Sequence, residues 1–525
     1  MKNIQKKLII VFLAVLLIVS SIKVIAQENN TTQWFNFRGS KDNIAITDTK
    51  TARTAEEAKL KWTFTLKDAA DWSSNVSDPI IVNDNIYIAV ADELLIIDSD
   101  GKEIKKASLE EPIGHICRLI YIDGRVIVPI KNGRLQAFAV DSLETEWLSE
   151  ALPIYVQDDI EFEHQTLSTL TTDNGYIYRA TVCADWTASY YGVFQCIDLT
   201  TGAVKWTYIN EEAGYYWSGA AHFDNIVVIA GDDGNLISLN SDTGEKIDEE
   251  KLSEAVRSTI AVSGNKTFFT TTDGKLYKAT VKSDGSFEEI KNVQFAASST
   301  STPAIYNNQA IVGGSSGAED GYKGIAAVID VNTMTIVKSI TLPANVQSAP
   351  LISTGHENET YAYFTANKEP GGIYALKLGE SSAKSIFTPT GEEANYCVAS
   401  IIADKNGTLY YTNDSGKLFA VAYDIKETES SEPDISSSEN SSSESISSEI
   451  LSSSISSEDN SSSQVSTISQ PEVSSNTPES EVQMDSPKTG DSSNLMFYII
   501  LLISSVGVMI VLIIKKQKSL IKEQK

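Results

Sequence analysis

Short hydrophobic runs separated by turn-forming residues recur along most of the chain. In residues 196–206 one run leads into Asp198 and Gly202, and a second run ends at Trp206. An Asp side chain can cap a tight turn, and glycine readily takes the positive φ that such a turn requires. The pattern predicts two antiparallel strands joined by a tight turn, with the broad apolar face of the Trp side chain available to dock on a neighbouring unit.

Related units recur eight times, at intervals of roughly 40 to 60 residues, which marks the chain as a repeat protein. In the first unit, residues 79–82 and 86–89 form two short strands before the turn residue, and two more strands follow it. Four short strands per unit are typical of a propeller blade, whereas the coils of a β-solenoid are shorter and more uniform. We therefore expect an all-β, eight-bladed β-propeller over residues 27–425. The turn residues are Asp92, Gly133, Gly192, Gly234, Gly274, Gly324, Gly371 and Gly416.

The eighth unit ends near Tyr423, before its fourth strand. A suitable strand lies at the other end of the repeat region, at residues 60–66. If this N-terminal strand completes the last blade, the ring closes and no sheet edge is left open. The sequence thus predicts seven whole blades and one blade built from both ends of the repeat region.

The two ends of the chain carry targeting features. Lysines precede an apolar run at residues 8–19, and small residues follow it, which predicts a secretory signal peptide (residues 1–26) cleaved after Ala26; an uncleaved anchor is the alternative. Residues 426–485 are rich in Ser and Glu and lack aromatic residues, so we expect a disordered stalk. Residues 495–514 are long and apolar enough for a transmembrane helix, and a lysine-rich tail follows them.

Residues 486–525 resemble the sorting signal of sortase-anchored surface proteins of Gram-positive bacteria. A Pro-x-Thr-Gly motif, the apolar span and the basic tail occur in the order of this signal, with Ser486 where the family usually has Leu. The resemblance implies that a sortase cuts between Thr489 and Gly490 and joins the new carboxyl group to cell-wall peptide. We expect an extracellular protein held in the cell wall or cell membrane; a plain membrane anchor is the alternative. The motif residues are Pro487, Lys488, Thr489 and Gly490.

The net charge of −28 disfavours nucleic acid and anionic lipid as partners and favours cations or basic partners. The four cysteines, at positions 117, 183, 196 and 397, form no CxxC motif and no adjacent pair. Buried free thiols are the simplest interpretation. One disulfide between Cys183 and Cys196, facing each other across a hairpin, is the alternative.

Two stretches resemble the quinoprotein dehydrogenase-like (PQQ-repeat) β-propellers. The motif Ala/Cys-x-Asp-x-x-Thr-Gly-x-x-x-Trp at residues 196–206 is similar to their tryptophan-docking repeat. Residues 34–39, followed by Leu-Lys-Trp at 60–62, are similar to the start of such chains. The similarity is closest to the outer-membrane assembly lipoprotein branch, which uses this propeller without a cofactor. The resemblance extends over about residues 34–424 and implies a protein that binds or scaffolds.

The sequence offers no recognisable catalytic or metal motif. The quinoprotein enzymes use an adjacent Cys pair and a Ca²⁺ ion beside a catalytic Asp, and this chain has no adjacent Cys pair. Its four histidines show no HxH, HExxH or i,i+4 spacing, so a zinc site is not expected. We expect no cofactor, PQQ included, and no catalytic residue. The first hypothesis is a wall-anchored binding or scaffolding module; the alternative is a secreted quinone- or metal-dependent oxidoreductase with degenerate motifs.

Candidate ligand-binding residues lie in the long connections that share one face of a propeller: from the second to the third strand, and from the outer strand to the next inner strand. Around the third, fourth and sixth blades these connections are rich in acidic and aromatic residues, which suit sugars, cationic groups or basic peptides. The partner would be an extracellular protein or glycan that the sequence does not identify; a solvated acidic rim is the alternative. The candidates are Tyr155, Asp158, Asp159, His164, Asp185, Trp186, Tyr190, Tyr191, Glu211, Glu212, Tyr215, Tyr216, Trp217, Glu319, Asp320 and Tyr322.

The sorting hypothesis predicts the effect of Thr489→Ala. The variant removes the residue whose carboxyl group a sortase would transfer, so it should remain in the membrane fraction while the wild type becomes covalently attached to the wall. Muramidase digestion followed by immunoblotting measures this difference. Equal release of both proteins by muramidase would rule out the sorting signal.

Overall fold

The computed structural model describes residues 33–71, 73–185 and 188–424. The predicted signal peptide, stalk and sorting signal lie outside these residues. Within them, no helix is long and apolar enough to cross a membrane, and the predicted span at 495–514 is outside the described part of the chain.

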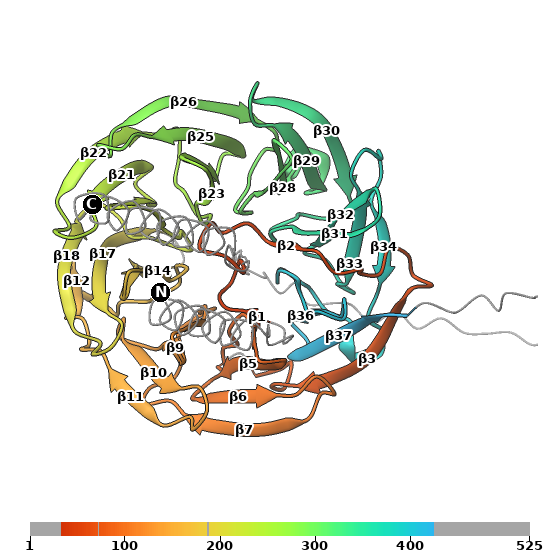
Figure 1. The fold of residues 1–525 in the computed structure, drawn as a ribbon, viewed down its shortest axis with the longest axis horizontal. Helices are drawn as coiled ribbons and strands as arrows, with labels where there is room; N and C mark the ends of the chain where they lie inside the picture. Colours follow the sequence, from red (N-terminus) through yellow and green to blue (C-terminus); the bar gives the residue numbers. More distant parts are fainter. Residues whose placement is uncertain (1–32, 72, 186–187, 425–525) are drawn as a thin grey trace, which may run out of the picture. The chain divides into compact units, whose positions relative to one another are not determined.

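Eight four-stranded antiparallel sheets are arranged around a ring, as Figure 1 shows. The first strand of each sheet lies nearest the centre of the ring and the fourth lies at its rim. The predicted all-β, eight-bladed propeller is therefore confirmed. Blade 1 contains β4 (Ile80–Val82), β5 (Asn85–Val90), β6 (Glu93–Ile97) and β7 (Glu103–Ser108); blade 2 contains β8 (Ile120–Ile122), β9 (Arg125–Pro129), β10 (Leu135–Ala139) and β11 (Thr145–Leu148); blade 3 contains β14 (Thr171–Asp173), β15 (Tyr176–Ala180), β17 (Ser189–Asp198) and β18 (Val204–Asn210), with the short β16 (Cys183–Ala184) beside β17; blade 4 contains β19 (Ala221–Phe223), β20 (Ile226–Ala230), β21 (Asn235–Asn240) and β22 (Lys246–Lys251).

The remaining blades repeat this order, and the last one combines both ends of the repeat region. Blade 5 contains β23 (Ala261–Ser263), β24 (Lys266–Thr270), β25 (Lys275–Val281) and β26 (Phe287–Gln294); blade 6 contains β27 (Ala304–Tyr306), β28 (Gln309–Ser315), β29 (Gly324–Asp330) and β30 (Thr335–Leu342); blade 7 contains β31 (Leu351–His356), β32 (Glu359–Thr365), β33 (Ile373–Lys377) and β34 (Lys384–Phe387); blade 8 contains β35 (Ile402–Ala403), β36 (Leu409–Asn413), β37 (Lys417–Tyr423) and β3 (Ala58–Thr65).

The N-terminal strand β3 closes the ring. It pairs antiparallel with β37, so that Trp62 lies opposite Ala420 and Phe64 opposite Leu418. This is the position that the sequence pattern assigns to residues 60–66. Because β3 occupies the outer edge of blade 8, the two ends of the ring are joined by a full ladder of backbone hydrogen bonds.

Tryptophan side chains lock successive blades together. The indole Nε1 of Trp206, on the outer strand of blade 3, donates to the Ser241 carbonyl in the next blade at 2.9 Å. Its ring covers Gly244, where an added Cβ would lie 2.7 Å from the indole and where φ is +75°. Trp147 and Trp62 make the same two contacts with the blades that follow them. Glycine is therefore required at this turn for both its backbone angle and its lack of a side chain.

Other residues take the place of Trp in blades that lack it. Ile247, on the outer strand of blade 4, covers Gly285 of blade 5, where an added Cβ would lie 2.7 Å from the Ile Cδ1. Lys105 of blade 1 donates to the Ser142 carbonyl of blade 2 at 2.7 Å, and Lys338 of blade 6 donates to the Gly379 carbonyl of blade 7 at 2.6 Å. By strand register, Lys105 and Lys338 stand at the position of Trp206. In blade 4 that position is Asp248, which accepts a hydrogen bond from the backbone N–H of Phe287 in blade 5 at 2.8 Å, and Ile247 comes one residue before it.

The chain before β3 runs through the middle of the ring, where Figure 1 shows it in red between β1 (Gln33–Trp34) and β2 (Ile46–Thr47). β1 pairs with the inner strand of blade 1, and β2 pairs parallel with the inner strand of blade 7. Between them, Asn43 donates to the Ile260 carbonyl at 2.9 Å, and Arg38 donates to the Pro350 carbonyl at 3.1 Å. This axial segment (residues 33–52) therefore connects inner strands on opposite sides of the ring.

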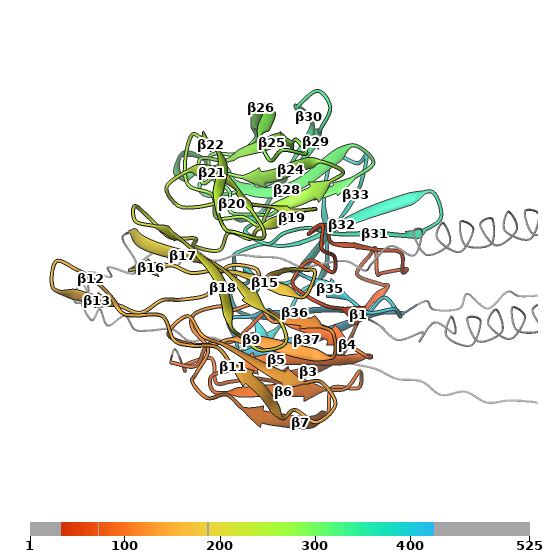
Figure 2. The same cartoon turned by 60° about the vertical axis from the view of Figure 1, so that its left-hand side comes forward.

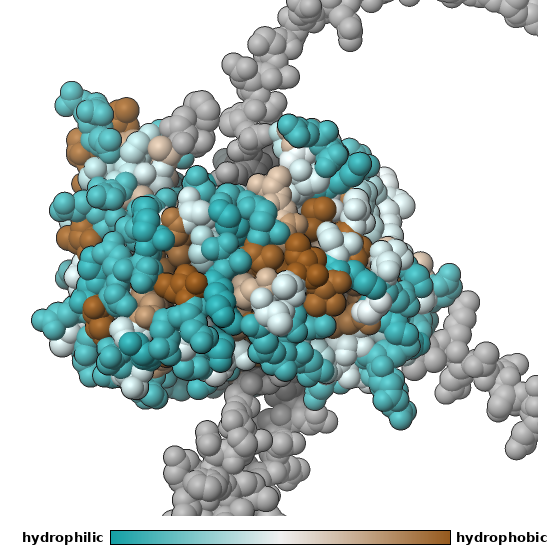
Figure 3. Space-filling model, turned by 90° about the horizontal axis from the view of Figure 1, so that it is seen from above, coloured by the Kyte–Doolittle hydropathy of each residue, from teal (hydrophilic) through white to brown (hydrophobic). Residues whose placement is uncertain are grey.

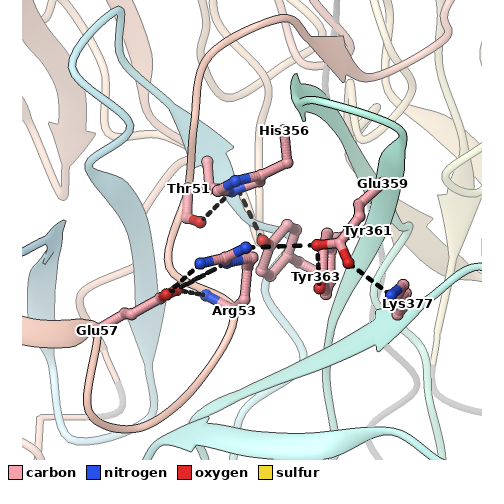
Figure 4. Close-up of polar contacts among 8 residues, drawn as sticks. All are labelled: Thr51, Arg53, Glu57, His356, Glu359, Tyr361, Tyr363 and Lys377. Carbon is pink, nitrogen blue, oxygen red and sulfur yellow. Dashed lines mark hydrogen bonds and ion pairs between the residues drawn. The ribbon is translucent and has the colours of Figure 1, made fainter. Parts of the chain in front are cut away.

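A polar cluster ties the end of the axial segment and the approach to β3 to blade 7 (Figure 4). Arg53 pairs with Glu57 at 2.5 Å and with Glu359 at 3.3 Å, and Lys377 pairs with Glu359 at 2.6 Å. The hydrogen bond from Lys377 is the main reason why the pKa of Glu359 falls to about 2. His356 lies 2.8 Å from the Thr51 carbonyl. These contacts hold β3 near the blade that precedes it in the ring.

The rim of the propeller is mainly hydrophilic. Figure 3 shows the side on which β26 and β30 lie, where hydrophilic residues predominate and hydrophobic ones gather in patches between them. Ile336 and Val337 on β30 are among the exposed hydrophobic side chains.

The four cysteines are buried free thiols. The alternative of a disulfide between Cys183 and Cys196 is wrong. The two residues do not face each other, because Cys183 is opposite Tyr191 and Cys196 is opposite Tyr178 and Trp206. Burial raises the pKa of both thiols to about 12, so both remain protonated.

Blade docking predicts a graded stability series at position 206. Trp206→Ala removes a buried indole and exposes the Gly244 turn, so we expect a loss of about 3 kcal/mol in the free energy of unfolding. Trp206→Ile should lose less, because an isoleucine side chain, that of Ile247, covers the Gly285 turn of the following blade. Urea unfolding measures both, with Val204→Ala as the control on an exposed position of the same strand, which should change stability by less than about 0.5 kcal/mol. A Trp206→Ala variant as stable as this control would contradict the docking role.

Candidate binding face at blade 3

A hairpin inserted before blade 3 projects from the ring, as Figure 2 shows. It consists of β12 (Tyr155–Gln157) and β13 (Ile160–Phe162), and Tyr155 lies directly opposite Phe162. Asp158 and Asp159 form its turn with φ of 51° and 62°, which matches the type I′ geometry that joins two tightly paired strands. The sequence predicts only a connecting loop at this segment, and the structure shows a hairpin instead.

Aromatic rings from the hairpin stack on β17. Tyr155 lies parallel to Tyr191, with ring centroids 4.5 Å apart and an interplanar angle of 12°. Phe162 packs against Tyr190 at 4.9 Å, and the ring of His164 meets the edge of Tyr191 at 5.7 Å. The sequence therefore selected four residues that the fold does bring together: Tyr155, His164, Tyr190 and Tyr191. We call these four side chains and Phe162 the aromatic stack.

Acidic side chains surround the aromatic stack. Asp158 and Asp159 are exposed at the tip of the hairpin, and Glu211 lies close enough to Tyr191 to raise its pKa, although burial of the phenol contributes more. Asp185 accepts a hydrogen bond of 2.9 Å from the Tyr190 hydroxyl. This end of blade 3 thus presents flat aromatic rings beside carboxylates, a combination suited to cations and to polar ligands with a flat apolar face.

His164 is the buried member of the aromatic stack. It is only 3% exposed, and its Nδ1 is 2.8 Å from the Thr181 hydroxyl. Burial, with a smaller contribution from the charge of Arg179, lowers the pKa of His164 to about 4. The imidazole is therefore neutral at physiological pH, and its role here is to support Tyr191.

Trp217 is a core residue and not part of an exposed rim, which corrects its assignment as a ligand contact. Its side chain is 0% exposed and packs with Phe37, Leu167 and Val182 on the axis of the ring. The error arises because Phe37 comes from the axial segment, whose path through the ring is not visible in the local sequence. Trp186 lies outside the described residues.

Tyr216 joins an ion pair near the axis. The guanidinium of Arg257 lies 4.6 Å from the centroid of the Tyr216 ring and 3.1 Å from Asp232. Burial raises the pKa of Asp232 to about 6, against the opposing effect of Arg257. Tyr216 is thus already in a cation–π contact within the chain.

A polar pocket lies between blades 3 and 4 and includes three of the predicted residues. Its volume is about 310 Å³. Glu211, Glu212 and Tyr215 come from the connection between the two blades, and the other walls come from β18, β21 and β22. The lining residues are Tyr208, Ile209, Asn210, Glu211, Glu212, Tyr215, Asp233, Asn235, Ile237, Lys246 and Glu249.

The predicted residues of blade 6 are separate from this face. Glu319 and Asp320 lie in the short helix η1 (Ala318–Asp320) between β28 and β29, and Tyr322 follows it with 54% of its side chain exposed. Blade 6 is three blades away from blade 3 around the ring (Figure 1). These three residues therefore belong to a different part of the rim.

The axis of the ring is occupied by side chains of the protein itself. Phe37, Leu167, Val182 and Trp217 fill it with apolar side chains. The Arg118 guanidinium donates hydrogen bonds to the Thr169 hydroxyl and the Trp217 carbonyl. Among the described residues, no three His, Cys, Asp or Glu side chains are placed to hold a metal ion.

Comparison with known proteins identifies the repeat type. Residues 190–424 match the family described as "Outer membrane protein assembly factor BamB". These repeats are of the PQQ-like, BamB type. The predicted repeat family is confirmed for this part of the chain, which begins within β17 of blade 3 and ends after β37. No curated protein matches the sequence.

Several solved structures share the fold of this PQQ-like propeller. A europium-containing methanol dehydrogenase superposes with a TM-score of 0.55 at 10% identity, over 75% of this chain and 98% of that one. Quinohemoprotein alcohol dehydrogenase ADHIIG from Pseudomonas putida HK5 gives 0.56 at 10% identity, over 76% and 81%. BamB from Moraxella catarrhalis gives 0.49 at 13% identity, over 70% and 100%. At these identities the likeness concerns the fold alone.

Acid should destabilise the propeller through His164. The pKa of His164 falls from 6.5 to about 4 on folding, so the unfolded chain binds more protons than the folded chain between these pH values. The contribution of neutral His164 to stability is therefore complete above pH 6.5 and is lost as the pH falls towards 4. We expect the wild type to lose about 2 kcal/mol more than His164→Gln between pH 7 and pH 5. Urea unfolding at both pH values tests this. The same loss of stability in the wild type and in His164→Gln between these pH values would refute the assignment.

Proposed function

We propose that this protein is an extracellular binding module, held in the cell wall of a Gram-positive bacterium, whose propeller presents the blade 3 face to a partner. The observation that carries the proposal is the aromatic stack: Tyr155 and Tyr191 lie parallel at 4.5 Å on a hairpin that projects from the ring. No step of chemistry is assigned to the protein. The partner is an extracellular protein or glycan with cationic or polar groups.

The physical argument for binding is the cost of placing these rings at the surface. Tyr155 and Tyr191 are only half-buried, so part of each ring remains in contact with water. Partly exposed, pre-stacked tyrosines lose little conformational entropy when a ligand covers them, which is why tyrosine is favoured in binding surfaces. The surrounding carboxylates add attraction for a basic partner.

The layout of the termini supports the location. A signal peptide, a Ser-rich stalk and a sorting signal would carry the propeller out of the cell and hold it away from the wall surface. A binding module benefits from such a spacer because the spacer increases the volume that the module can search.

An oxidoreductase is the competing function, since two of the similar structures are named as dehydrogenases. Their identity of 10% to this chain supports the common fold and no more. A dye-reduction assay with added quinone and Ca²⁺ separates the two functions. Catalytic reduction of the dye would support the oxidoreductase and contradict the binding module.

The binding proposal predicts the behaviour of Tyr155→Ala. A glycan and protein array probed with residues 27–424 should reveal a partner, and Tyr155→Ala should weaken its binding about tenfold, or roughly 1.4 kcal/mol, because half of the exposed stack is lost. The matched control is Tyr322→Ala on blade 6, which removes an exposed tyrosine from a different part of the rim. Equal losses in both variants, or none in Tyr155→Ala, would show that the blade 3 face is not the contact.

A further inference from the structure

The pocket between blades 3 and 4 carries an excess of negative charge. Its walls include four carboxylates, those of Glu211, Glu212, Asp233 and Glu249, and one cation, Lys246. Lys246 is engaged by Glu249, and Asp233 accepts hydrogen bonds from the amides of Asn210 and Asn235 at 2.9 and 3.0 Å. The carboxylates of Glu211 and Glu212 have no such partner among the described residues. Two carboxylates at the pocket therefore have no hydrogen-bond or ion-pair partner among the described residues.

A buried hydroxyl group gives an independent indication of a ligand. The Tyr215 side chain lines the pocket and is 1% exposed, and its hydroxyl makes no hydrogen bond of normal geometry among the described residues, although the Asn210 side chain lies close enough to oppose the effect of burial on its pKa. Leaving a buried hydroxyl unpaired costs about 1–3 kcal/mol, so such groups are normally satisfied by a ligand or by water. Burial raises the pKa of Tyr215 well above its usual value, so the group remains a neutral phenol. Its oxygen can accept a hydrogen bond from a donor in the pocket.

The loop that carries Glu211 and Glu212 is ordered in advance. The Asn210 side-chain oxygen accepts hydrogen bonds from the backbone N–H groups of Glu212 and Ala213 at 3.1 and 3.2 Å. The same side chain donates to Asp233 on the opposite wall. Asn210 thus links the loop to blade 4, which fixes the backbone at Glu212 before any ligand arrives.

We infer that this pocket binds an alkylammonium group, such as the side chain of a lysine presented by the partner. Glu211 and Glu212 supply the opposite charge, the Tyr215 hydroxyl accepts a hydrogen bond from the ammonium, and the Tyr208 ring in the pocket wall adds a face for cation–π contact. A volume of about 310 Å³ suits one long side chain and is small for an oligosaccharide.

The inference rests on the proposed function and names the chemical class of its ligand. The pocket adjoins the aromatic stack, because Gly192, the neighbour of Tyr191, pairs with Asn210, the neighbour of Glu211 in the pocket wall. A partner that covers the stack with one part of its surface therefore brings a neighbouring basic side chain to the pocket.

The experiment uses residues 27–424, which contain the whole closed ring. The probe is Nα-acetyl-lysine N-methylamide, and the uncharged comparison is the corresponding norleucine derivative. Isothermal titration calorimetry at low ionic strength should detect binding of the lysine probe alone. No binding of this probe, or equal binding of the norleucine compound, would overturn the inference.

Two variants locate the site. The double variant E211Q/E212Q should weaken binding of the lysine probe at least tenfold, while E319Q/D320N, which removes the same number of charges on blade 6, should leave it within about twofold. Equal weakening by both double variants would mean that net charge and not this pocket attracts the probe.

Tyr215→Phe separates a ligand role from a structural one. It should weaken probe binding several-fold without lowering the melting temperature of the free protein, because it removes a hydroxyl that the free protein leaves unpaired. A marked drop in the melting temperature would show that the hydroxyl serves the fold and would remove it from the site. If the lysine probe fails while Tyr155→Ala still weakens the partner found on the array, this inference fails and the proposed function stands.

Discussion

The pairing of β3 with β37 is the contact on which the ring depends. Eight sheets that each contact only their neighbours form an open arc unless the first and last are joined, and an open arc would expose a sheet edge and two apolar blade faces. In this chain one strand from the start of the repeat region completes the last blade. The residues just before it are held to blade 7 by Arg53 and His356, so the joint is fixed on both sides. The axial segment adds a second closure, because it pairs with the inner strands of blades 1 and 7, the two neighbours of blade 8.

Docking of each outer strand on the next blade explains why the repeats can diverge and still stack. The shared feature is a turn with a residue at positive φ, a glycine where Trp62, Trp147, Trp206 and Ile247 dock. Trp206 docks with a ring and one hydrogen bond, Ile247 with apolar contact, and Lys338 with a charged hydrogen bond to a carbonyl. Since the docking side chains differ in chemistry, the repeat is clear in the turn residues and faint in the docking residues.

The fold could be predicted from the sequence because its signals are local. Each turn residue lies within a few positions of the strands that it joins, and the unpaired eighth unit pointed to residues 60–66 as its missing strand. The site could be predicted only in part. The aromatic and acidic composition around blade 3 was sufficient to select Tyr155, Tyr191 and Glu211. Trp217 was misplaced, because its packing partner Phe37 comes from the axial segment, which is distant in sequence. The hairpin β12–β13 was missed because its strands are too short to show a period.

Net charge alone cannot make this surface selective. With a formal charge of −28, the chain attracts cations over its whole surface, and such attraction is screened by salt within about 8 Å at physiological ionic strength. Selectivity requires a place where the charge is partly withdrawn from water and combined with groups of fixed direction. Blade 3 offers this combination, since Glu211 lies between the stacked ring of Tyr191 and a pocket that contains the buried hydroxyl of Tyr215. A partner that contacts the hydroxyl, the carboxylates and the stacked rings together binds more tightly than one that offers positive charge alone. The rigid blades hold the short connecting loop in place, so the loop can present these groups in fixed directions.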